Sequence, residues 1–307
     1  MAKYILKRLL VMILTIFIVM VITFILMQFM PGSPFSNPKL TKSQIELLNQ
    51  QYGLNKPIWQ QFVQYIWNAF HFDFGTSYVN TGQSVTSIIA QRLPVSLFIG
   101  FQALIVAVPL GMFVGTIQGV KRNTRTDYSL SFITIFFIAL PDFLFAMVLL
   151  LLLAVKYPIF PINGFDGWTS SILPSIALAA AIVGYIARFT RSQTIETLNS
   201  DQIQLAFAKG LDKSEVVEHH VVRNSLIPVL TIIGPVFANF LTGSVLVEKI
   251  FGIPGIGQQF LTSVTSKDFP VIMGTTILYT VILQVMILIT DIITALVDPR
   301  IRLGGKS

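Results

Sequence analysis

Apolar stretches that lack charged side chains recur along the whole chain. Five of them, each about 20 residues or longer, contain no Asp, Glu, Lys or Arg: 9–30, 93–120, 167–187, 224–247 and 269–290. A sixth stretch, 128–155, is equally apolar except for Asp142. A helix needs about 20 such residues to cross the hydrocarbon core of a bilayer. The pattern therefore predicts six membrane crossings, with a buried carboxylate in the third.

These stretches are expected to be helices. A backbone in lipid must satisfy its own polar groups, and only helices and closed barrels do so. No part of the sequence shows the alternation of apolar and polar positions over about ten residues that is typical of barrel strands. The predicted fold class is an all-α integral membrane protein with about six transmembrane helices.

Lys and Arg are distributed unevenly between the connecting segments. Of the 21, 14 lie at the two ends and in the segments after the second and fourth spans, and 7 lie in the three other segments. Because basic residues are retained on the cytoplasmic side of short loops, both termini are predicted to be cytoplasmic. The stretch 9–30 ends at Pro31 without a small-residue cleavage site, so it is predicted to remain as an anchor.

Composition agrees with a membrane protein. Of 307 residues, 53% are apolar and 11% are charged, whereas a soluble domain has about 25% charged residues. The net charge of +7 is attributed to membrane orientation rather than to nucleic acid, because the basic residues lie in short loops beside apolar stretches. The absence of cysteine excludes disulfides, thiolate metal sites and cysteine nucleophiles.

Residues 31–92 form the one long segment on the external side. Ser43 and Glu46 have the spacing of a capping box, which predicts a helix that Gly53 ends. After Pro57, apolar residues recur at helical spacing: Ile58, Trp59, Phe62, Val63, Ile66, Trp67 and Phe70. Two interpretations of this second helix stay open, namely packing in the headgroup zone and contact with an external binding partner.

The sequence offers no catalytic or nucleotide-binding pattern. His71, His219 and His220 stand at no metal-ligand spacing with carboxylates. The C-terminal Gly305-Lys306-Ser307 imitates the end of a phosphate-binding loop, but Arg300 occupies the position of its first glycine. The chain is therefore predicted not to be an enzyme and to bind neither ATP nor a metal by itself.

Asp142 is the one charged residue deep inside a predicted span. A charge near the bilayer centre costs about 2.5–3.5 kcal/mol, so such a residue faces a bundle interior or a water-filled path. Pro141 precedes it and permits a break in the helix. Pro141 and Asp142 are candidates for the translocation path, where the carboxylate would meet a substrate amine. The alternative is a carboxylate that is hydrogen-bonded to neighbouring helices for packing.

The segment between the fourth and fifth spans, 188–223, is longer than a connection requires. Ala206, Ala208 and Gly210 are small and alternate with apolar neighbours, so a partner could approach the backbone closely. A solvated connector is the alternative interpretation.

Several of these residues resemble a known family, the binding-protein-dependent ABC importer permeases of the oligopeptide, dipeptide and nickel branch. The stretch Ala206-Phe207-Ala208-Lys209-Gly210-Leu211, followed by Asn224-Ser225-Leu226-Ile227-Pro228, is similar to the EAA loop of that branch. Gln204 and Leu205 depart from the strict motif. The resemblance therefore assigns contact with an ATPase subunit to Ala206, Ala208, Lys209, Gly210 and Leu211 only.

Other segments extend the resemblance over nearly the whole chain. They are 4–10, 31–34, 52–57, 73–75, 92–94, 247–257 and 298–302. The run 247–257, Val-Glu-Lys-Ile-Phe-Gly-Ile-Pro-Gly-Ile-Gly, is the most specific of these matches. Its residues Gly252, Pro254, Gly255 and Gly257 are candidates for an external gate or receptor contact, with a re-entrant structural turn as the alternative. The long external segment is similar to that of the B-type subunit of the family.

The resemblance implies a function and a set of partners. The chain is expected to be a permease subunit of an ATP-driven importer that translocates oligopeptides across the bacterial plasma membrane. Expected partners are a second homologous permease, two ABC ATPase subunits that hold ATP and Mg²⁺, an external peptide-binding protein, the peptide and membrane lipid. Dipeptide and nickel importers are the alternatives, followed by a secondary transporter.

The expected organisation has three parts. Residues 1–30 form the first transmembrane helix, 31–92 the external segment with short helices, and 93–300 the permease core. Within that core, the segment 188–227 carries the coupling loop, whose contact with the ATPase is placed at 200–215.

Overall fold

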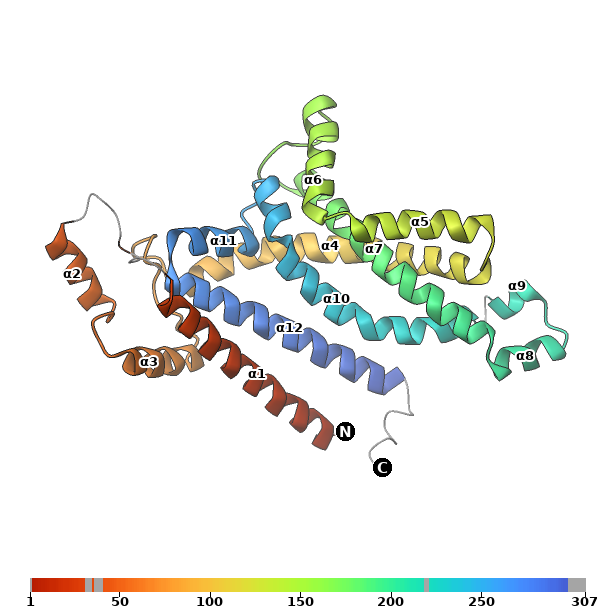
Figure 1. The fold of residues 1–307 in the computed structure, drawn as a ribbon, viewed down its shortest axis with the longest axis horizontal. Coiled ribbons are helices and arrows are strands. Elements are labelled where there is room, and N and C mark those ends of the chain that lie inside the picture. Colours follow the sequence, from red (N-terminus) through yellow and green to blue (C-terminus); the bar gives the residue numbers. More distant parts are fainter. Residues whose placement is uncertain (1, 31–34, 36–40, 218–220, 298–307) are drawn as a thin grey trace. The chain divides into compact units, whose positions relative to one another are not determined.

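The computed structural model describes residues 2–30, 35, 41–217 and 221–297, and these are almost entirely helical (Figure 1). The helices are α1 (Ala2–Gln28), α2 (Lys42–Gln51), α3 (Ile58–Phe70), α4 (Val85–Val120), α5 (Arg125–Ala139), α6 (Asp142–Leu150), the π-helical turn η1 (Leu151–Lys156), α7 (Trp168–Leu198), α8 (Asp201–Ala208), α9 (Lys213–Val216), α10 (Val222–Ile250), α11 (Ile256–Ser266) and α12 (Phe269–Val297). Within the described residues, extended pairing is limited to one bridge, between Thr76 and Ser84. The predicted all-α fold is confirmed.

Four helices have the length and apolar composition to cross a bilayer. They cover Leu6–Gln28, Val85–Val120, Trp168–Leu198 and Phe269–Ile293. The helices α5 and α6, with η1, form a bent fifth candidate. Helix α10 runs over the predicted span 224–247, but some of its side chains lie outside the described residues, so a crossing there stays a prediction. The described part thus contains four or five candidate spans where the sequence predicted six.

The predicted span 128–155 is broken in the structure, at the position where the sequence permits a break. Helix α5 ends at Ala139, α6 begins at Asp142, and the two are bent by 96°. Pro141 explains the break, because it has no N–H to donate and disfavours helical geometry at the preceding residue. Leu140 accordingly adopts an extended conformation, with ψ of 118°.

The chain divides into two compact units, each described here by itself. The first comprises residues 1–95 and 254–282, and the second comprises 96–253 and 283–307. The first unit therefore holds α1 to α3, the beginning of α4, α11 and the first half of α12. The second holds the rest of α4 and α12 and the helices α5 to α10.

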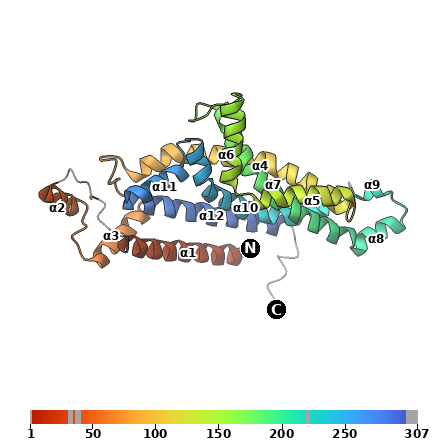
Figure 2. The same ribbon diagram turned by 45° about the horizontal axis from the view of Figure 1, so that its top comes forward.

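The first unit is held together by aromatic and aliphatic packing at the end of α1. Phe24 and Met27 of α1 join Ile272 and Met273 of α12 in a buried cluster, against which Phe62 of α3 packs. Figure 2 shows α3 beside this end of α1. A second cluster, containing Val85 and Ile88 of α4 with Ile256 and Val271, joins α4 to α11 and α12.

A buried carboxylate ties the loop before α4 to the start of α12. Asp268 accepts a hydrogen bond from the Ser77 hydroxyl and a second one, at 3.0 Å, from the backbone N–H of Tyr78. Ser77 Oγ in turn accepts from the N–H of Asn80 at 2.8 Å. Ser77 and Asp268 are both about 1% exposed or less, so these bonds replace water for the buried groups.

The expected capping box at α2 is shifted by two residues. Thr41, not Ser43, is the N-cap, and the side chain of Gln44, not that of Glu46, accepts the reciprocal hydrogen bond. The Thr41 N–H donates to Gln44 Oε1 at 2.8 Å, and the Gln44 N–H donates to Thr41 Oγ1 at 3.4 Å. Helix α2 ends as predicted, because Gly53 follows its C-cap with a φ of +67°.

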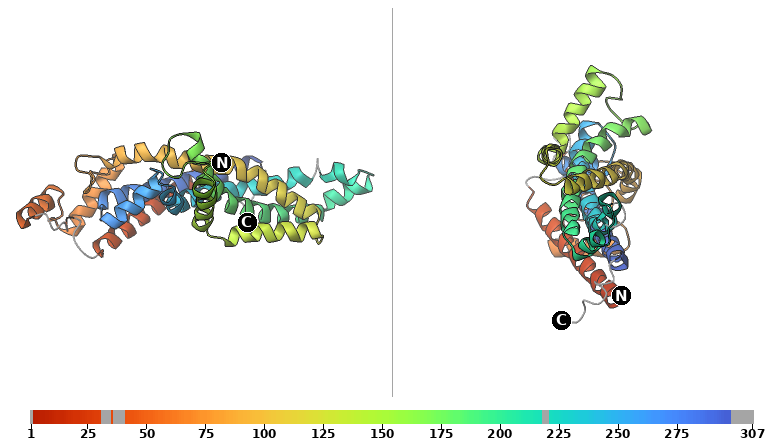
Figure 3. Two further views of the ribbon diagram at one scale, coloured as in Figure 1. Left: turned by 90° about the horizontal axis from the view of Figure 1, so that it is seen from above. Right: turned by 90° about the vertical axis from the view of Figure 1, so that its right-hand side faces the viewer.

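In the second unit α7 is the central, mostly buried helix, and it packs against α5, α6 and α10 (Figure 3). It also packs closely against α4 through three glycines, Gly111, Gly115 and Gly119, spaced by four residues. A Cβ on Gly111 would lie 2.8 Å from Ile186, and one on Gly119 would lie 2.5 Å from Thr194. Such small-residue spacing lets two helix backbones approach each other.

Candidate functional site

The segment 199–217, between α7 and α10, forms two short helices joined by a tight turn. We call it the α8–α9 segment. Helix α8 ends at Ala208, and Gly210 then takes a left-handed φ of +85°. The N–H of Gly210 donates to Phe207 O at 2.9 Å, and that of Leu211 donates to Ala206 O at 3.3 Å. A glycine after a helix end suits this turn, because it adopts positive φ without strain.

The α8–α9 segment has a small apolar core of its own. The buried members are Ile203 and Ala206 of α8, Val216 of α9 and Val221, and the partly buried Leu198, Leu211 and Val217 pack against them. Leu198 is the last residue of α7. The segment is therefore folded onto the end of α7.

Two large apolar side chains of α8 are nevertheless exposed, and because they are two residues apart they lie on different sides of the helix. Leu205 is 57% exposed and Phe207 is 42% exposed. Ala208, Lys209 and Gly210 are also exposed, and a Cβ on Gly210 would meet no atom within 4 Å. Of the five residues predicted to contact a partner, Ala208, Lys209 and Gly210 thus lie on the open surface, whereas Ala206 is buried and Leu211 is partly buried.

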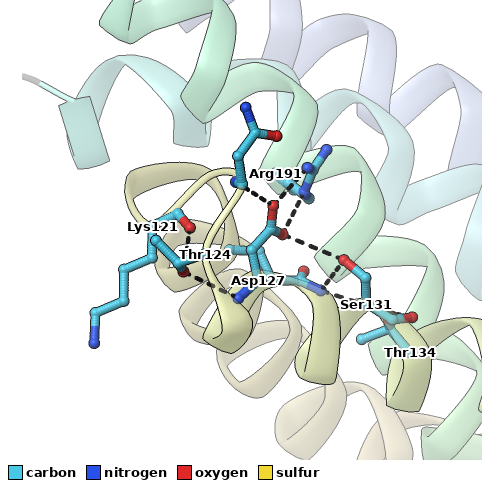
Figure 4. A network of polar contacts seen from close by, with 8 residues as sticks. Lys121, Thr124, Asp127, Ser131, Thr134 and Arg191 are labelled. Atoms are coloured by element: carbon cyan, nitrogen blue, oxygen red, sulfur yellow. Dashed lines mark hydrogen bonds and ion pairs between the residues drawn. The ribbon is translucent and has the colours of Figure 1, made fainter.

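A charged network braces α7 beside the turn that joins α4 and α5 (Figure 4). Arg191 of α7 donates twice to Asp127 of α5, from Nε to Oδ1 and from Nη2 to Oδ2, both at 2.8 Å. Asp127 also accepts from the N–H of Asn123 at 3.0 Å and from the Ser131 hydroxyl at 3.3 Å. The Asp127 side chain is 2% exposed and that of Arg191 is 32% exposed. Two parallel hydrogen bonds from one guanidinium to both carboxylate oxygens stabilise a carboxylate that is buried away from water.

Asp142 lies in the first turn of α6, directly after the bend at Pro141. Its Oδ1 accepts a hydrogen bond from the N–H of Phe143 at 2.7 Å. The positive end of the helix dipole also favours a carboxylate at this position. The side chain is half-buried. The hydrogen bond from the backbone and the helix dipole therefore both stabilise the Asp142 carboxylate in an apolar helix.

Gly252, Pro254 and Gly255 lie in the turn between α10 and α11, and Gly257 lies in the first turn of α11. In the second unit, Gly252 has a φ of +60°, and an added Cβ would collide with the side-chain amide of Asn163. The N–H of Ile253 donates to Glu248 O at 2.8 Å, which closes the end of α10. In the first unit, Gly255 is the N-cap of α11.

The predicted site residues thus lie on separate elements. Ala206 to Leu211 lie on the α8–α9 segment, Pro141 and Asp142 at the bend before α6, and Gly252 to Gly257 after α10. No group of three or more His, Asp or Glu residues is placed to bind a metal within the described ranges. His219, His220, Arg300 and Lys306 lie outside those ranges.

The first unit contains a cavity of about 480 Å³ that the sequence did not reveal. It is lined by the ends of α1 and α2, one side of α3, the 73–78 loop and the start of α12. Two of its tyrosines, Tyr65 and Tyr78, have pKa values raised by burial, which the Asp268 carboxylate reinforces at Tyr78. Both phenols are therefore neutral at physiological pH.

Sequence reasoning also missed Asp127, Arg191 and the α4 glycines. No local pattern connects Asp127 with Arg191, which are 64 positions apart. The glycines could have been recognised, because Gly111, Gly115 and Gly119 follow the small-xxx-small spacing of packed membrane helices.

Comparison with known proteins covers almost the entire chain. The family model described as binding-protein-dependent transport system inner membrane component matches residues 107–303, and the model of its N-terminal part matches residues 1–100. Two solved structures share the fold over 70% of this chain and 94% of their own. One is the methionine ABC transporter MetNI in inward-facing conformations, with a TM-score of 0.52 and 16% identity. The other is an amino acid ABC transporter with histidines, with a TM-score of 0.53 and 19% identity.

Relatives in sequence match over their full length. The dipeptide transport system permease protein DppB of Lactococcus lactis subsp. cremoris is 52% identical over 99% of this chain and 100% of its own. DppB of Bacillus subtilis is 38% identical, with both chains covered completely. The oligopeptide transport system permease protein OppB of Escherichia coli K12 is 36% identical over 98% of this chain and 100% of its own. The chain belongs to the family of binding-protein-dependent transport system inner membrane components, the multi-pass permeases that work with other components of ABC importers.

Proposed function

We propose that this chain is a permease subunit of an ATP-driven importer that carries oligopeptides across the bacterial plasma membrane. Its family membership and the names of its full-length relatives support this function. In this proposal the chain is a transport subunit and not an enzyme. Separate ABC ATPase subunits bind ATP and Mg²⁺ and hydrolyse the nucleotide.

The observation that carries the proposal is the pair of exposed apolar side chains on α8, Leu205 and Phe207. Leu205 and Phe207 are held at the surface of a short helix whose residues Ile203 and Ala206 pack into the core of the α8–α9 segment. Exposed apolar side chains on a well-packed support are typical of a protein contact. In an ABC importer permease, the partner for such a contact is an ATPase subunit.

The packing of α8 suggests how nucleotide binding reaches the membrane helices. The core of the α8–α9 segment includes Leu198, the end of α7, so a displaced α8 would pull on α7. Helix α7 in turn packs against α5, α6 and α10. Nucleotide then shifts the helices between two packings, provided that the ATPases bind one of them more tightly.

The proposed complex has four kinds of partner. They are a second homologous permease, two ABC ATPases, an external peptide-binding protein, and lipid around the spans. In it both termini and the α8–α9 segment face the cytoplasm, as the distribution of Lys and Arg predicts. Residues Gly252, Pro254, Gly255 and Gly257 are proposed as an external gate or receptor contact, and Pro141 with Asp142 as part of the translocation path.

Co-purification tests the docking surface. The chain carries a C-terminal tag, is extracted in mild detergent, and its bound proteins are identified by mass spectrometry. We expect a second permease and an ABC ATPase with the wild type. Leu205→Glu is expected to lose the ATPase and keep the second permease, because a charge placed in an apolar contact must be desolvated without a partner.

Two variants make this experiment specific. Gln202→Glu adds the same charge at another exposed position of α8 and is expected to retain the ATPase. Gly210→Arg places a side chain on a residue with φ of +85° and is expected to lose the ATPase as well. An ATPase that remains bound to Leu205→Glu, or a wild-type chain that purifies without any ATPase, would contradict the proposal.

Dipeptides are the second candidate substrate, and a specific observation favours them. The relative with 52% identity is named a dipeptide permease, whereas the oligopeptide permease of E. coli is 36% identical. Competition decides between the two classes, since unlabelled dipeptides and pentapeptides can be compared as inhibitors of labelled peptide uptake in cells. Inhibition by pentapeptides supports the oligopeptide importer, and inhibition by dipeptides alone supports the second candidate.

A further inference from the structure

Helix α3 carries more apolar surface than the described protein covers. One side of the helix, with Phe62 and Tyr65, packs against Phe24 and Met27 of α1. Its polar side, with Gln61, Gln64 and Asn68, lines the cavity of the first unit. A third side is both apolar and exposed.

The exposed side forms a continuous stripe along the helix. Trp59, Val63 and Trp67 follow one another at intervals of four residues, and Phe70 comes three residues later, so all four share one side. They are 65%, 57%, 67% and 67% exposed, respectively. Two tryptophans on one exposed stripe are unusual for a surface in contact with bulk water.

The position of α3 relative to α1 sets its depth in the membrane. Helix α1 is a candidate span that reaches Gln28. The rings of Phe24 in α1 and Phe62 in α3 lie with their centroids 5.1 Å apart. Helix α3 therefore lies beside the last turn of a membrane span, as Figures 1 and 2 show. Leu26 of α1 and Phe29, which directly follows the helix, are themselves exposed and apolar.

Length and composition exclude a crossing by α3. Its 13 residues span about 20 Å, whereas the hydrocarbon core is about 30 Å thick. It contains no charged residue, and its polar side consists of amides. A short helix with tryptophans on one side and polar groups on the other suits the boundary between headgroups and acyl chains.

We propose that α3 lies in the lipid headgroup region of the outer surface, with Trp59, Val63, Trp67 and Phe70 inserted among the acyl chains. Helix α3 packs directly against α1, a candidate membrane span whose apolar side chains are mostly exposed, which identifies lipid as the occupant of the stripe. The polar side of α3 then remains at the cavity, where its amides contact water. The helix anchors the external segment to the membrane and sets the height of the cavity above it.

Spin labels on single cysteines test this placement, because the natural chain contains no cysteine. Val63→Cys places the label on the stripe, and Gln64→Cys is the matched control on the polar side one residue later. The labelled chain is purified with its bound subunits and reconstituted in phospholipid vesicles. Collision with oxygen, which concentrates in lipid, is compared with collision with a water-soluble nickel chelate.

The proposal predicts a ratio of oxygen to nickel accessibility that is several-fold higher at position 63 than at position 64. A label at 63 that is equally open to the nickel chelate would place the stripe in water and overturn the proposal. A label at 63 that is shielded from both reagents would also overturn it, because a protein subunit would then cover the stripe. Cysteine-free wild type, treated identically, gives the background from other subunits.

Discussion

At the scale of single residues, Asp127 and Arg191 form a bidentate ion pair inside the second unit. The carboxylate is almost completely buried and has four hydrogen-bond donors around it, from Arg191, Asn123 and Ser131. A carboxylate in this setting depends on its partners, since burial without them would cost several kcal/mol. The pair joins the start of α5 to the C-terminal half of α7. The α8–α9 segment follows that end of α7.

Removal of the carboxylate is expected to destabilise the protein. In Asp127→Ala, Arg191 loses its bidentate partner and is left partly buried, which should cost about 1–3 kcal/mol. The fraction of monodisperse protein that survives heating in detergent, measured against temperature, reports this loss. Glu196→Ala removes an exposed carboxylate from the same helix α7 and should stay within about 0.5 kcal/mol of wild type. Equal heat resistance of the two variants would show that the ion pair is not a brace.

Asp142 allows a sharper test of the translocation path. Asp142→Asn keeps the size of the side chain and an oxygen that can accept from the Phe143 N–H, but it removes the charge. If the carboxylate meets a substrate amine, this variant should reduce peptide uptake while the amount of assembled complex stays constant. Unchanged uptake by Asp142→Asn, with a lower protein yield from Asp142→Leu, would assign the residue to helix packing.

Some of these residues could be predicted from the sequence and others could not. Asp142 and Gly210 were recognised, because a carboxylate in an apolar stretch and a glycine after a short helical pattern are local signals. Asp127 and Arg191 lie at the ends of apolar stretches, where charges are ordinary, and only the packing of α5 on α7 brings them together. Whether the predicted site residues act as proposed stays a prediction.

At the scale of elements, α4 and α7 of the second unit pack with their backbones close together. Gly115 lies at the centre of the three glycines, and an added Cβ would collide with the Ala187 carbonyl and approach Thr190 Cβ to 2.7 Å. Backbone atoms of a packed helix cannot move aside as a flexible side chain does. The two helices therefore tolerate only glycine at this contact.

A single methyl group at this position is expected to separate the helices. Gly115→Ala should cost about 1–3 kcal/mol by overpacking, even though alanine is the better helix former. Phe113→Leu, at a position that is 65% exposed, is the matched change on the outer side of α4 and should fold normally. Thermal survival in detergent compares the two, and a Gly115→Ala protein as stable as wild type would disprove the tight contact.

The long apolar helices were predicted well, because hydropathy alone locates them. Helix ends and bends were predicted less well, because they depend on single residues. The apolar stretches located α1, α4, α7 and α12, although α4 begins eight residues before its predicted span and α7 continues to Leu198. Both helices extend through polar residues, which a hydropathy scan counts as loop. The sequence permitted a break at Pro141, but the angle of 96° between α5 and α6 and the position of the N-cap at Thr41 depend on backbone geometry that composition does not encode.

At the scale of the whole molecule, the central claim is that this chain moves peptide only when ATPase partners drive it. A polytopic chain with one buried acid is also compatible with a secondary transporter, which would use an ion gradient. The two classes differ in their energy source and in the role of α8. A carrier driven by an ion gradient does not bind an ATPase, so it does not need the exposed apolar side chains of α8.

Uptake into proteoliposomes tests this claim most directly. The purified complex is reconstituted with the external binding protein added outside and nucleotide enclosed inside, and entry of a labelled peptide is measured with ATP, with ADP, and with a proton gradient alone. The account predicts uptake with ATP only, and its loss in Leu205→Glu but not in Gln202→Glu. Uptake that a proton gradient drives without ATP, and that Leu205→Glu leaves intact, would contradict it.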